Sequence, residues 1–227
     1  MRDKVVVVTG GYGVLGHAVA EAALAAGAFV AILDREQADK IAARDRLLVP
    51  DGVDLTDFAA VKRAFETVAA RFGKIDGLAN IAGGFRWQTL GDGDLPGWTE
   101  MFHINLLTAA TATKAALPYL RATQGAIVNV GSAPAKKAGV GMGAYAASKA
   151  GVLRLTESLA EEEKNAGVRV NAVLPTIIDT PRNRADMPKA DFSRWVKPEE
   201  IAKAILFLLS SDATAITGAE LLISGRT

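Results

Sequence analysis

A tyrosine and a lysine four residues apart are the first feature of the sequence that points to chemistry. Tyr145 and Lys149 bound the run Tyr-Ala-Ala-Ser-Lys, and residues at this spacing share one face of a helix. A neighbouring ammonium favours the phenolate, so we expect Lys149 to lower the pKa of Tyr145 from its usual value of about 10. Such a phenol can exchange a proton with an alcohol or a carbonyl oxygen.

A serine hydroxyl makes this prediction more specific, because a Tyr-x-x-x-Lys pair alone is common on helix surfaces. Ser132 follows the predicted strand Ala126–Val130 almost directly. It therefore falls at the carboxyl edge of the predicted sheet, where α/β proteins bind ligands. We expect its hydroxyl to hold a substrate oxygen beside Tyr145.

A glycine-rich turn near the amino end predicts a dinucleotide site. The run Thr-Gly-Gly-Tyr-Gly-Val-Leu-Gly ends at Gly16 and lies between the predicted strand Val5–Val8 and the predicted helix Val14–Ala26. Glycines let the backbone approach a pyrophosphate, and the helix that follows supplies free N–H groups.

The end of the next predicted strand indicates which dinucleotide is bound. Asp34 directly follows Phe29–Leu33, where a carboxylate accepts hydrogen bonds from the adenosine ribose hydroxyls. A 2′-phosphate would meet the same charge, so we expect NAD(H) to be preferred. Arg35 follows Asp34 and leaves use of NADP(H) open.

Strand and helix signals alternate along the whole chain and predict the elements that must position these groups. Beyond those already given, the expected strands are Leu47–Val49, Ile75–Ile81, Val168–Leu174 and Glu220–Ile223. The expected helices are Gln37–Asp45, Thr56–Phe72, Leu95–Arg121, Tyr145–Asn165 and Pro198–Ser210. Thr56 is expected to cap the second of these helices, and Pro118 to end or kink the third. This order predicts an α/β fold, a single Rossmann-type domain over residues 1–227, with a seven-stranded, mostly parallel sheet and helices on both faces. Residues 175–197, between the expected strand Val168–Leu174 and the expected helix Pro198–Ser210, are expected to form a substrate-binding loop.

Composition excludes several other classes of function. The chain of 227 residues has 26 Lys and Arg against 25 Asp and Glu, a net charge of +1. This balance gives no basic field for nucleic acid and no polybasic membrane anchor. With no cysteine and two histidines, disulfides and a metal site are not expected. No stretch reaches the ~18 apolar residues that a membrane span needs, so we expect a cytoplasmic protein.

The chain resembles the short-chain dehydrogenase/reductase family over nearly its full length. The resemblance is carried, in the family's order, by the glycine-rich turn, Asn80-Ile81-Ala82-Gly83, Asn105, Ser132, Tyr145 and Lys149. It implies transfer of hydride between a nicotinamide and a small carbonyl or alcohol. By resemblance the tyrosine is the general acid/base and the serine orients the substrate oxygen. The lysine lowers the tyrosine's pKa and binds the nicotinamide ribose, and the asparagine maintains a water-linked proton relay.

The motifs and the resemblance together predict the residues of two subsites, although core packing is an equal alternative for the aromatic residues Phe85, Trp87 and Trp195. Those expected to bind the cofactor are Gly10, Tyr12, Gly13, Val14, Leu15, Gly16, Asp34, Arg35, Asp54, Leu55, Asn80, Ala82, Gly83, Tyr145, Lys149, Pro175, Ile178 and Thr180. Those expected in the substrate pocket are Gly84, Phe85, Trp87 and Trp195. His103, two positions before Asn105, is interpreted as a packing residue. The family also implies a homodimer or homotetramer, to which the alanine-rich faces of the helices around Ala109 and Ala146 would contribute.

Three alternatives stay open at this stage. The turn glycines, Trp87 and the segment from Asp179 to Trp195 resemble dihydropteridine reductase, which allows a quinonoid pterin as substrate. Dihydropteridine reductase, however, has no serine at the position that matches Ser132, whereas this chain has one. A catalytically silent NAD-binding regulator is the second alternative, although all four chemical positions are occupied. The third, a sugar-nucleotide epimerase, would need a further substrate domain.

Overall fold

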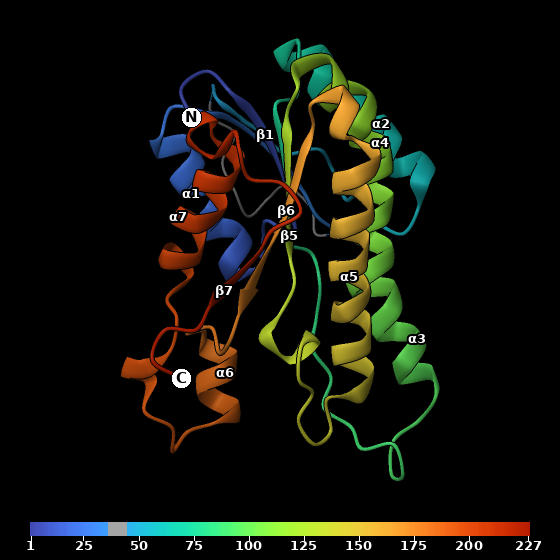
Figure 1. Cartoon of the computed structure of the whole chain (residues 1–227), viewed down its shortest axis with the longest axis vertical. Helices are drawn as coiled ribbons and strands as arrows, with labels where there is room; N and C mark the ends of the chain where they lie inside the picture. Colours follow the sequence, from blue (N-terminus) through green and yellow to red (C-terminus); the bar gives the residue numbers. More distant parts are fainter. Residues whose placement is uncertain (36–44) are drawn as a thin grey trace.

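Seven parallel strands form one sheet in the order β3-β2-β1-β4-β5-β6-β7 (Figure 1). The computed structural model describes residues 1–35 and 45–227. The strands are β1 (Val5–Thr9), β2 (Phe29–Leu33), β3 (Leu47–Leu48), β4 (Gly77–Asn80), β5 (Ala126–Val130), β6 (Arg169–Pro175) and β7 (Glu220–Ile223). Every pairing is parallel, so the predicted fold class is confirmed.

Helices cover both faces of the sheet (Figure 1). One face carries α1 (Val14–Ala25) and α7 (Pro198–Leu209), and the other carries α2 (Phe58–Phe72), α4 (Thr108–Thr123) and α5 (Gly143–Glu162). Two short helices, α3 (Pro96–Phe102) and α6 (Pro181–Asp186), lie toward the carboxyl edge of the sheet (Figure 1). The remaining helical turns are η2 (His103–Leu107), η3 (Ala133–Ala135), η4 (Lys164–Ala166), η5 (Phe192–Arg194) and η6 (Ser211–Ala213).

The valine run of β1 shows why the sheet is buried on both faces. Successive side chains of a strand point to opposite faces. Val6 and Val8 accordingly pack in the cluster under α1 and α7, whereas Val5 and Val7 pack in the cluster under α2 and α4. An uninterrupted apolar run is therefore the pattern required of a central parallel strand.

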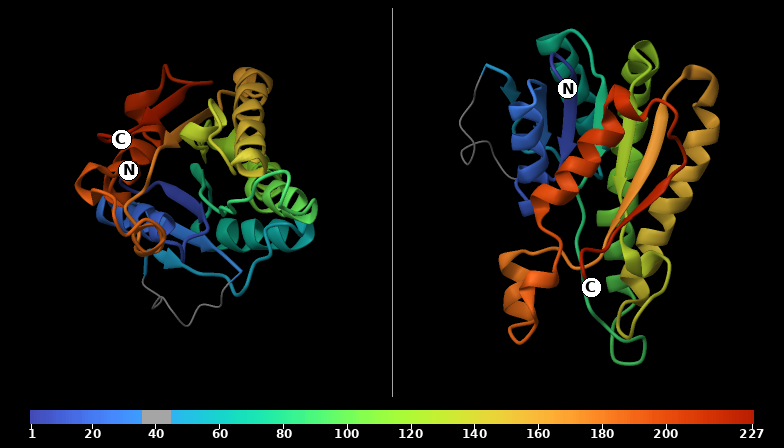
Figure 2. Two further views of the ribbon diagram at one scale, coloured as in Figure 1. Left: turned by 90° about the horizontal axis from the view of Figure 1, so that it is seen from below. Right: turned by 60° about the vertical axis from the view of Figure 1, so that its left-hand side comes forward.

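The order of the strands indicates where the sheet can bind a ligand. β1 pairs with β2 on one side and with β4 on the other, so the direction of chain progression reverses at β1. Open α/β sheets bind ligands at the carboxyl ends of the strands beside such a switch point. Figure 2 (left) views the molecule from this end, with helices on both sides of the sheet.

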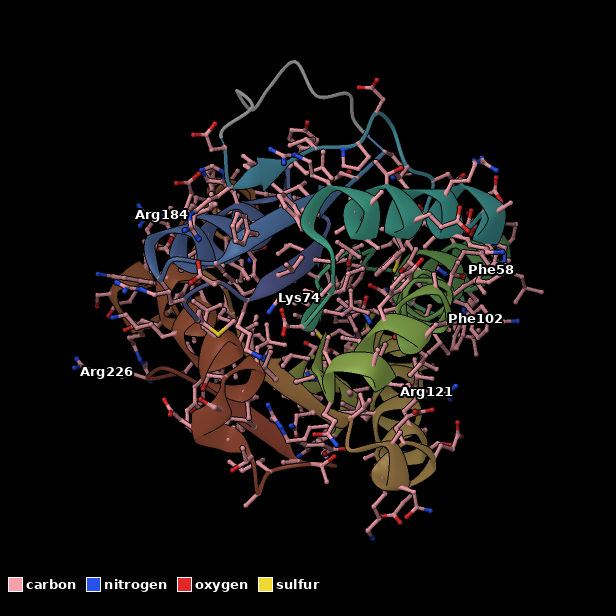
Figure 3. The ribbon with its side chains drawn as sticks, turned by 90° about the horizontal axis from the view of Figure 1, so that it is seen from above. Phe58, Lys74, Phe102, Arg121, Arg184 and Arg226 are labelled. Carbon is pink, nitrogen blue, oxygen red and sulfur yellow. The ribbon has the colours of Figure 1, made fainter. Side chains whose placement is uncertain are left out.

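At the opposite, amino edge of the sheet, a buried carboxylate bonds to Lys74, which is labelled in Figure 3. Asp76 pairs with Lys4 at 2.9 Å and with Lys74 at 3.1 Å, and it accepts the backbone N–H of Val5 at 2.9 Å. Burial alone raises the pKa of Asp76, but these hydrogen bonds outweigh burial and hold the pKa below its usual range.

Several predicted boundaries are wrong in ways that matter locally. Asp57 caps α2 by accepting the N–H groups of Ala59 and Ala60. Thr56 instead donates to Asp54 at 2.7 Å. The expected helix over Gln37–Asp45 lies outside the described residues, Asp45 excepted.

The long helix predicted over Leu95–Arg121 is confirmed from Pro96 to Thr123, with one π-helical turn inside it and no break at its proline. α3 passes into the π-helical turn η2 before α4 begins. Pro118 lies inside α4, which continues to Thr123. A proline costs a helix one hydrogen bond, yet buried Ala116 and Leu120 on either side continue the face that packs against the core.

Residues 175–197 are more ordered than an irregular loop. They contain α6 and η5, and the two ends of the segment meet in a parallel bridge between Ile178 and Val196. Pro198 opens α7, as its position in the sequence predicted. Within the described part of the chain, no helix combines the length and apolarity needed to cross a membrane.

Candidate active site

A cavity of about 1030 Å³ opens at the carboxyl ends of the strands. It brings together residues from the glycine-rich turn, β2, β4, β5, α5 and the segment that follows β6. The predicted residues that line it are Gly10, Tyr12, Gly13, Val14, Leu15, Gly16, Asp34, Arg35, Asp54, Leu55, Ala82, Gly83, Gly84, Phe85, Ser132, Tyr145, Lys149, Pro175, Ile178 and Thr180.

The glycine-rich turn has the geometry of an anion cradle. Gly10 has φ +69°, and a Cβ there would lie 2.8 Å from the Cα of Ala82. A Cβ at Gly16 would overlap the carbonyl oxygen of Gly10, so the first turn of α1 packs directly on the preceding loop. Among the described residues no side chain caps α1, and its first turn holds no acidic residue. These N–H groups fit the pyrophosphate of a dinucleotide.

Asp34 both lines the cavity and holds the turn. Its Oδ2 accepts the N–H of Tyr12 at 3.1 Å, and its Oδ1 accepts the N–H of Arg35 at 2.7 Å. The guanidinium of Arg35 lies close enough to Asp54 to help lower the pKa of that carboxyl, after the larger effect of hydrogen bonds from Thr56. The backbone of Arg35 thus bonds to Asp34, whereas the charge of its side chain acts on Asp54.

Tyr145 and Ser132 lie together, but the pKa of the phenol shifts against expectation. Ser132 is buried in extended backbone just after β5, and Tyr145 is in the first turn of α5. Burial raises the pKa of Tyr145, and a hydrogen bond with Ser132 opposes that rise without reversing it. The net shift of the Tyr145 pKa is therefore upward, whereas the sequence predicted a lowered pKa.

Lys149 is itself buried and bonded to the backbone of β5. Its side chain is 5% exposed, and Nζ donates to the carbonyl oxygen of Val130 at 2.8 Å. Burial lowers the pKa of Lys149 itself to about 8. With a pKa of about 8, the ammonium of Lys149 still carries its charge at neutral pH.

Asn105 is locked to the loop beside the lysine rather than lining the cavity. Its Nδ2 donates to Gly84 O and to Ser148 Oγ, each at 3.1 Å, and its Oδ1 accepts Gly84 N–H at 3.0 Å. A Cβ at Gly83 would lie 2.5 Å from Asn105 Oδ1 and 3.3 Å from Lys149 Nζ. Asn105 therefore holds residues 83 and 84 close to the lysine.

Asn80 does not lie where its predicted role in cofactor binding requires. It is 4% exposed and does not line the cavity. Its Nδ2 donates to Thr113 Oγ1 at 3.0 Å and to Asn129 Oδ1 at 2.9 Å. It therefore joins β4 to α4 and β5 in the interior.

The two predicted tryptophans of the substrate pocket also lie outside the cavity lining. Trp87 donates from Nε1 to Val140 O at 3.0 Å. Trp195 is 5% exposed and packs on Phe192, with ring centroids 4.8 Å apart. The sequence alone could not show whether these tryptophans line a pocket or pack against other residues, because aromatic side chains are common in both places.

Residues 175–197 are held by a stack of charged and aromatic side chains. Arg184, labelled in Figure 3, pairs with Asp179 at 2.6 and 2.7 Å and lies 4.8 Å from the centroid of the Phe192 ring. The Oγ1 of Thr180 accepts the N–H of Asn183 and caps α6. The stack fixes α6 over the rim of the cavity.

The sequence missed several residues that line the cavity. They are Thr56, Ile81, Glu100, His103, Ile104, Thr108, Val130, Gly131, Thr176, Pro181, Arg182 and Asn183. His103 is exposed and borders the cavity, so its interpretation as a packing residue is wrong. Its position two residues before Asn105 was the available signal, but the π-helical turn that orients it has no sequence signature.

Comparison with known proteins assigns the family. A family model described as "Enoyl-(Acyl carrier protein) reductase" matches residues 13–225. A 2-(S)-hydroxypropyl-CoM dehydrogenase of Xanthobacter autotrophicus is 33% identical over 248 residues, covering 99% of this chain and 96% of the relative. The chain belongs to the short-chain dehydrogenase/reductase family.

Further members of this family agree in sequence and in fold. A meso-2,3-butanediol dehydrogenase of Serratia marcescens is 32% identical, covering 98% of this chain and 94% of the relative. The crystal structure of a 3-ketoacyl-(acyl-carrier-protein) reductase from Brucella melitensis, complexed with NADH, superposes with a TM-score of 0.88. It is 28% identical and covers 99% of this chain and 98% of that chain.

Membership of the short-chain dehydrogenase/reductase family establishes the class of reaction. The protein is an oxidoreductase that uses a nicotinamide cofactor on alcohols or ketones. The glycine cradle and the uncapped start of α1 fit that cofactor. Residues 1–35 and 45–227 contain no group of three or more His, Cys, Asp or Glu side chains able to hold a metal ion.

Proposed function

We propose that the protein is an NAD(H)-dependent dehydrogenase/reductase of small secondary alcohols and ketones. The observation that carries the proposal is that Ser132, Tyr145 and Lys149 line the same cavity as the glycine-rich turn and Asp34. A proton donor, an oxygen-binding hydroxyl and a dinucleotide cradle are the groups that carbonyl reduction requires.

Tyr145 is the general acid for reduction and the base for oxidation. Its raised pKa keeps the phenol protonated near neutral pH, ready to donate to a carbonyl oxygen. Ser132 hydrogen-bonds the same oxygen as negative charge develops on it, which lowers the barrier. When bound, the nicotinamide supplies or accepts the hydride.

Lys149 is positioned to bind the ribose of the cofactor. Its Nζ already donates to Val130 O and faces Gly83. From there its remaining N–H groups can donate to ribose hydroxyls of the cofactor. Asn105 fixes the backbone of Gly84 next to it and maintains the path by which a proton leaves the site.

The preference for NAD(H) rests on Asp34 and on the position of Arg35. Asp34 presents carboxylate oxygens at the end of β2, where ribose hydroxyls can donate to them. Arg35 is close to Asp54 as well, so its charge is partly neutralised. A 2′-phosphate would therefore meet a net acidic wall.

The proposed function extends to the substrate site and to the assembly of the protein. Residues 175–197 contribute to the substrate site through Pro175, Ile178 and Thr180, which line the cavity. The protein acts in the cytoplasm as a homodimer or homotetramer. Phe102 on α3 supports association, because its side chain is 48% exposed on the protein surface.

Steady-state assays with purified protein test the proposed function. NADH or NADPH oxidation is followed with ketones, diketones and a quinonoid pterin, and NAD reduction with the corresponding alcohols. We expect the highest kcat/KM with NADH and a small ketone. Turnover confined to the pterin would overturn the proposed substrate class. NADH binding without turnover on any substrate would indicate the silent regulator.

A further inference from the structure

Two tryptophans pack on glycines in the segment that leads into α5. Trp87, in the loop after β4, faces Gly141, and Trp98, on α3, faces Gly143. We call this arrangement the indole clasp. It joins the loop that follows β4 to the segment that carries Tyr145, at the lower end of the molecule in Figure 1.

The contact at Gly141 is specific for glycine. A Cβ there would overlap the indole ring of Trp87, and the residue has φ +73°. Trp87 also donates from Nε1 to Val140 O at 3.0 Å, and Gln88 N–H donates to Gly141 O at 2.9 Å. Ring, side-chain and backbone contacts thus all join the same two short segments.

The contact at Gly143 extends the clasp to the first residue of α5. A Cβ at Gly143 would lie 3.3 Å from two atoms of the Trp98 indole, tighter than ordinary contact. Tyr145 follows two residues later, in the first helical turn. The start of α5 is therefore positioned by two rings from a separate part of the chain.

The same loop carries the residue that touches Tyr145. Phe85 lines the cavity, and its ring meets the Tyr145 ring edge-on, with centroids 5.0 Å apart and planes at 88°. On one side of it Gly84 is bonded to Asn105. On the other side Arg86 pairs with Asp94 at 2.8 Å.

We propose that the indole clasp is a positioning device for the acid/base tyrosine. By holding the two segments together, Trp87 and Trp98 press Phe85 against the Tyr145 ring and keep the phenol buried. Trp87 and Trp98 are positioning residues, and Phe85 forms an apolar wall for the substituent on the substrate carbonyl. This inference rests on the proposed function for the role of Tyr145, but the clasp itself is testable without turnover.

Four variants test the clasp: Gly141→Ala, Trp87→Ala, the double variant, and Gly73→Ala. Gly73 also has a left-handed φ, +81°, but a Cβ there would meet nothing within 4 Å. Gly73→Ala therefore reproduces the backbone strain without the ring contact. We expect kcat to fall about tenfold in Gly141→Ala and in Trp87→Ala, because small displacements of a catalytic group are costly. The Kd for NADH should be unchanged, and Gly73→Ala should keep its kcat.

The double variant and the pH profile separate positioning from general destabilisation. Once Trp87 is removed, a methyl at residue 141 has no ring to displace, so the double variant should add to Trp87→Ala only the effect of backbone strain that Gly73→Ala measures. Loosening the clasp exposes Tyr145, and its burial-raised pKa should fall. The pH at which reduction declines on the alkaline side should therefore move lower in both single variants.

Thermal unfolding supplies the readout that does not depend on catalysis. The Tm losses of Gly141→Ala and Trp87→Ala should likewise be non-additive. Additive losses in Tm together with multiplied losses in kcat would overturn the clasp. If no variant and no parent protein turns over a substrate, the proposed function fails, whereas non-additive Tm losses would still uphold the clasp.

Discussion

The phenol of Tyr145 sits in an environment that favours its neutral form. Burial raises its pKa, and Ser132 supplies the only side-chain hydrogen bond, among the described residues, that opposes the rise. The neutral phenol carries the proton that carbonyl reduction needs, whereas it must lose that proton before it can act as the base in alcohol oxidation. The free protein is therefore poised for reduction of a carbonyl, and oxidation of an alcohol should speed up as pH rises.

Replacing Tyr145 by Phe tests its role directly. The change keeps the ring and its edge-on contact with Phe85 while it removes the exchangeable proton. Turnover should fall by about 10²–10⁴-fold, the usual loss when a general acid or base is removed. Fluorescence titration should show unchanged affinity for NADH. Near-normal turnover in the variant would contradict the assignment.

Asp34 is the second residue whose chemistry can be isolated. Asp34→Asn keeps an oxygen that accepts the Tyr12 N–H but removes the charge, whereas Asp34→Ala removes both. The kcat/KM ratio of NADH to NADPH should fall in both variants, because a 2′-phosphate no longer meets a like charge. Only Asp34→Ala should also weaken NADH binding. A parent protein that prefers NADPH would instead assign control of the pocket to Arg35.

At the scale of elements, buried amides join the sheet to the helices that carry the site. Asn80 on β4 donates to Asn129 on β5, which in turn donates to Thr156 on α5 at 2.9 Å. Thr156 donates onward to Val152 O. This chain of hydrogen bonds fixes α5, and so Tyr145 and Lys149, relative to the strands.

Asn80→Ala distinguishes this structural role from the predicted role in cofactor binding. Loss of the amide leaves buried oxygens on Asn129 and Thr113 without this donor, which should cost about 1–3 kcal/mol of unfolding free energy. Asn171→Ala is a matched control, because Asn171 is also fully buried and bonded but lies between β6 and the segment before β7. Denaturant unfolding should show a comparable loss in both variants. A weaker affinity for NADH in Asn80→Ala alone would restore the cofactor role.

The stability of the whole molecule should depend on pH through Lys149. Its pKa is about 8 in the folded protein, against 10.5 for a solvent-exposed lysine of the unfolded chain. Between these two values the unfolded chain binds more protons than the folded protein. The unfolding free energy should therefore rise as the pH increases through this interval, by about 3 kcal/mol in total from this group.

Lys149→Met isolates that contribution. The variant removes the titrating group but keeps a long side chain, so the part of the rise that belongs to Lys149 should disappear. Urea unfolding at a series of pH values from about 8 to 10.5 measures the difference between the two proteins. Parallel pH dependences would show that the pKa of Lys149 is the same in the folded and unfolded states, which would contradict the prediction.

Association is the other property of the whole molecule. The small residues that predicted an interface are divided: Ala109, Ala112, Ala115, Ala116 and Ala146 are buried within the chain, whereas Ala110, Ala150 and Gly151 are half-buried and Ala147 is exposed. The exposed Phe102, labelled in Figure 3, is a better candidate for a contact between copies. Light scattering at micromolar concentration should give a dimer or tetramer mass, and Phe102→Ser should shift it toward the monomer. A monomer mass for the parent protein would refute association.

Local patterns in the sequence determined the sheet, its helices and the main chemical groups. The valine run of β1, the glycine-rich turn and the end of β2 at Asp34 were all predictable, because each depends on residues within a few positions. The spacing of Tyr145 and Lys149 on one helix was predictable for the same reason. These patterns sufficed to place Ser132, Tyr145 and Lys149 at one edge of the sheet.

Only the tertiary structure decided how those groups behave. The opposite pKa shifts of Tyr145 and Lys149 come from burial, and burial is set by elements distant in the sequence. Trp87 turned out to pack on Gly141 rather than on the cavity, and Asn80 to bond in the interior. A short sequence window determines where a side chain can point. Desolvation and contact depend on every element that packs around it, and these come together only when the chain has folded.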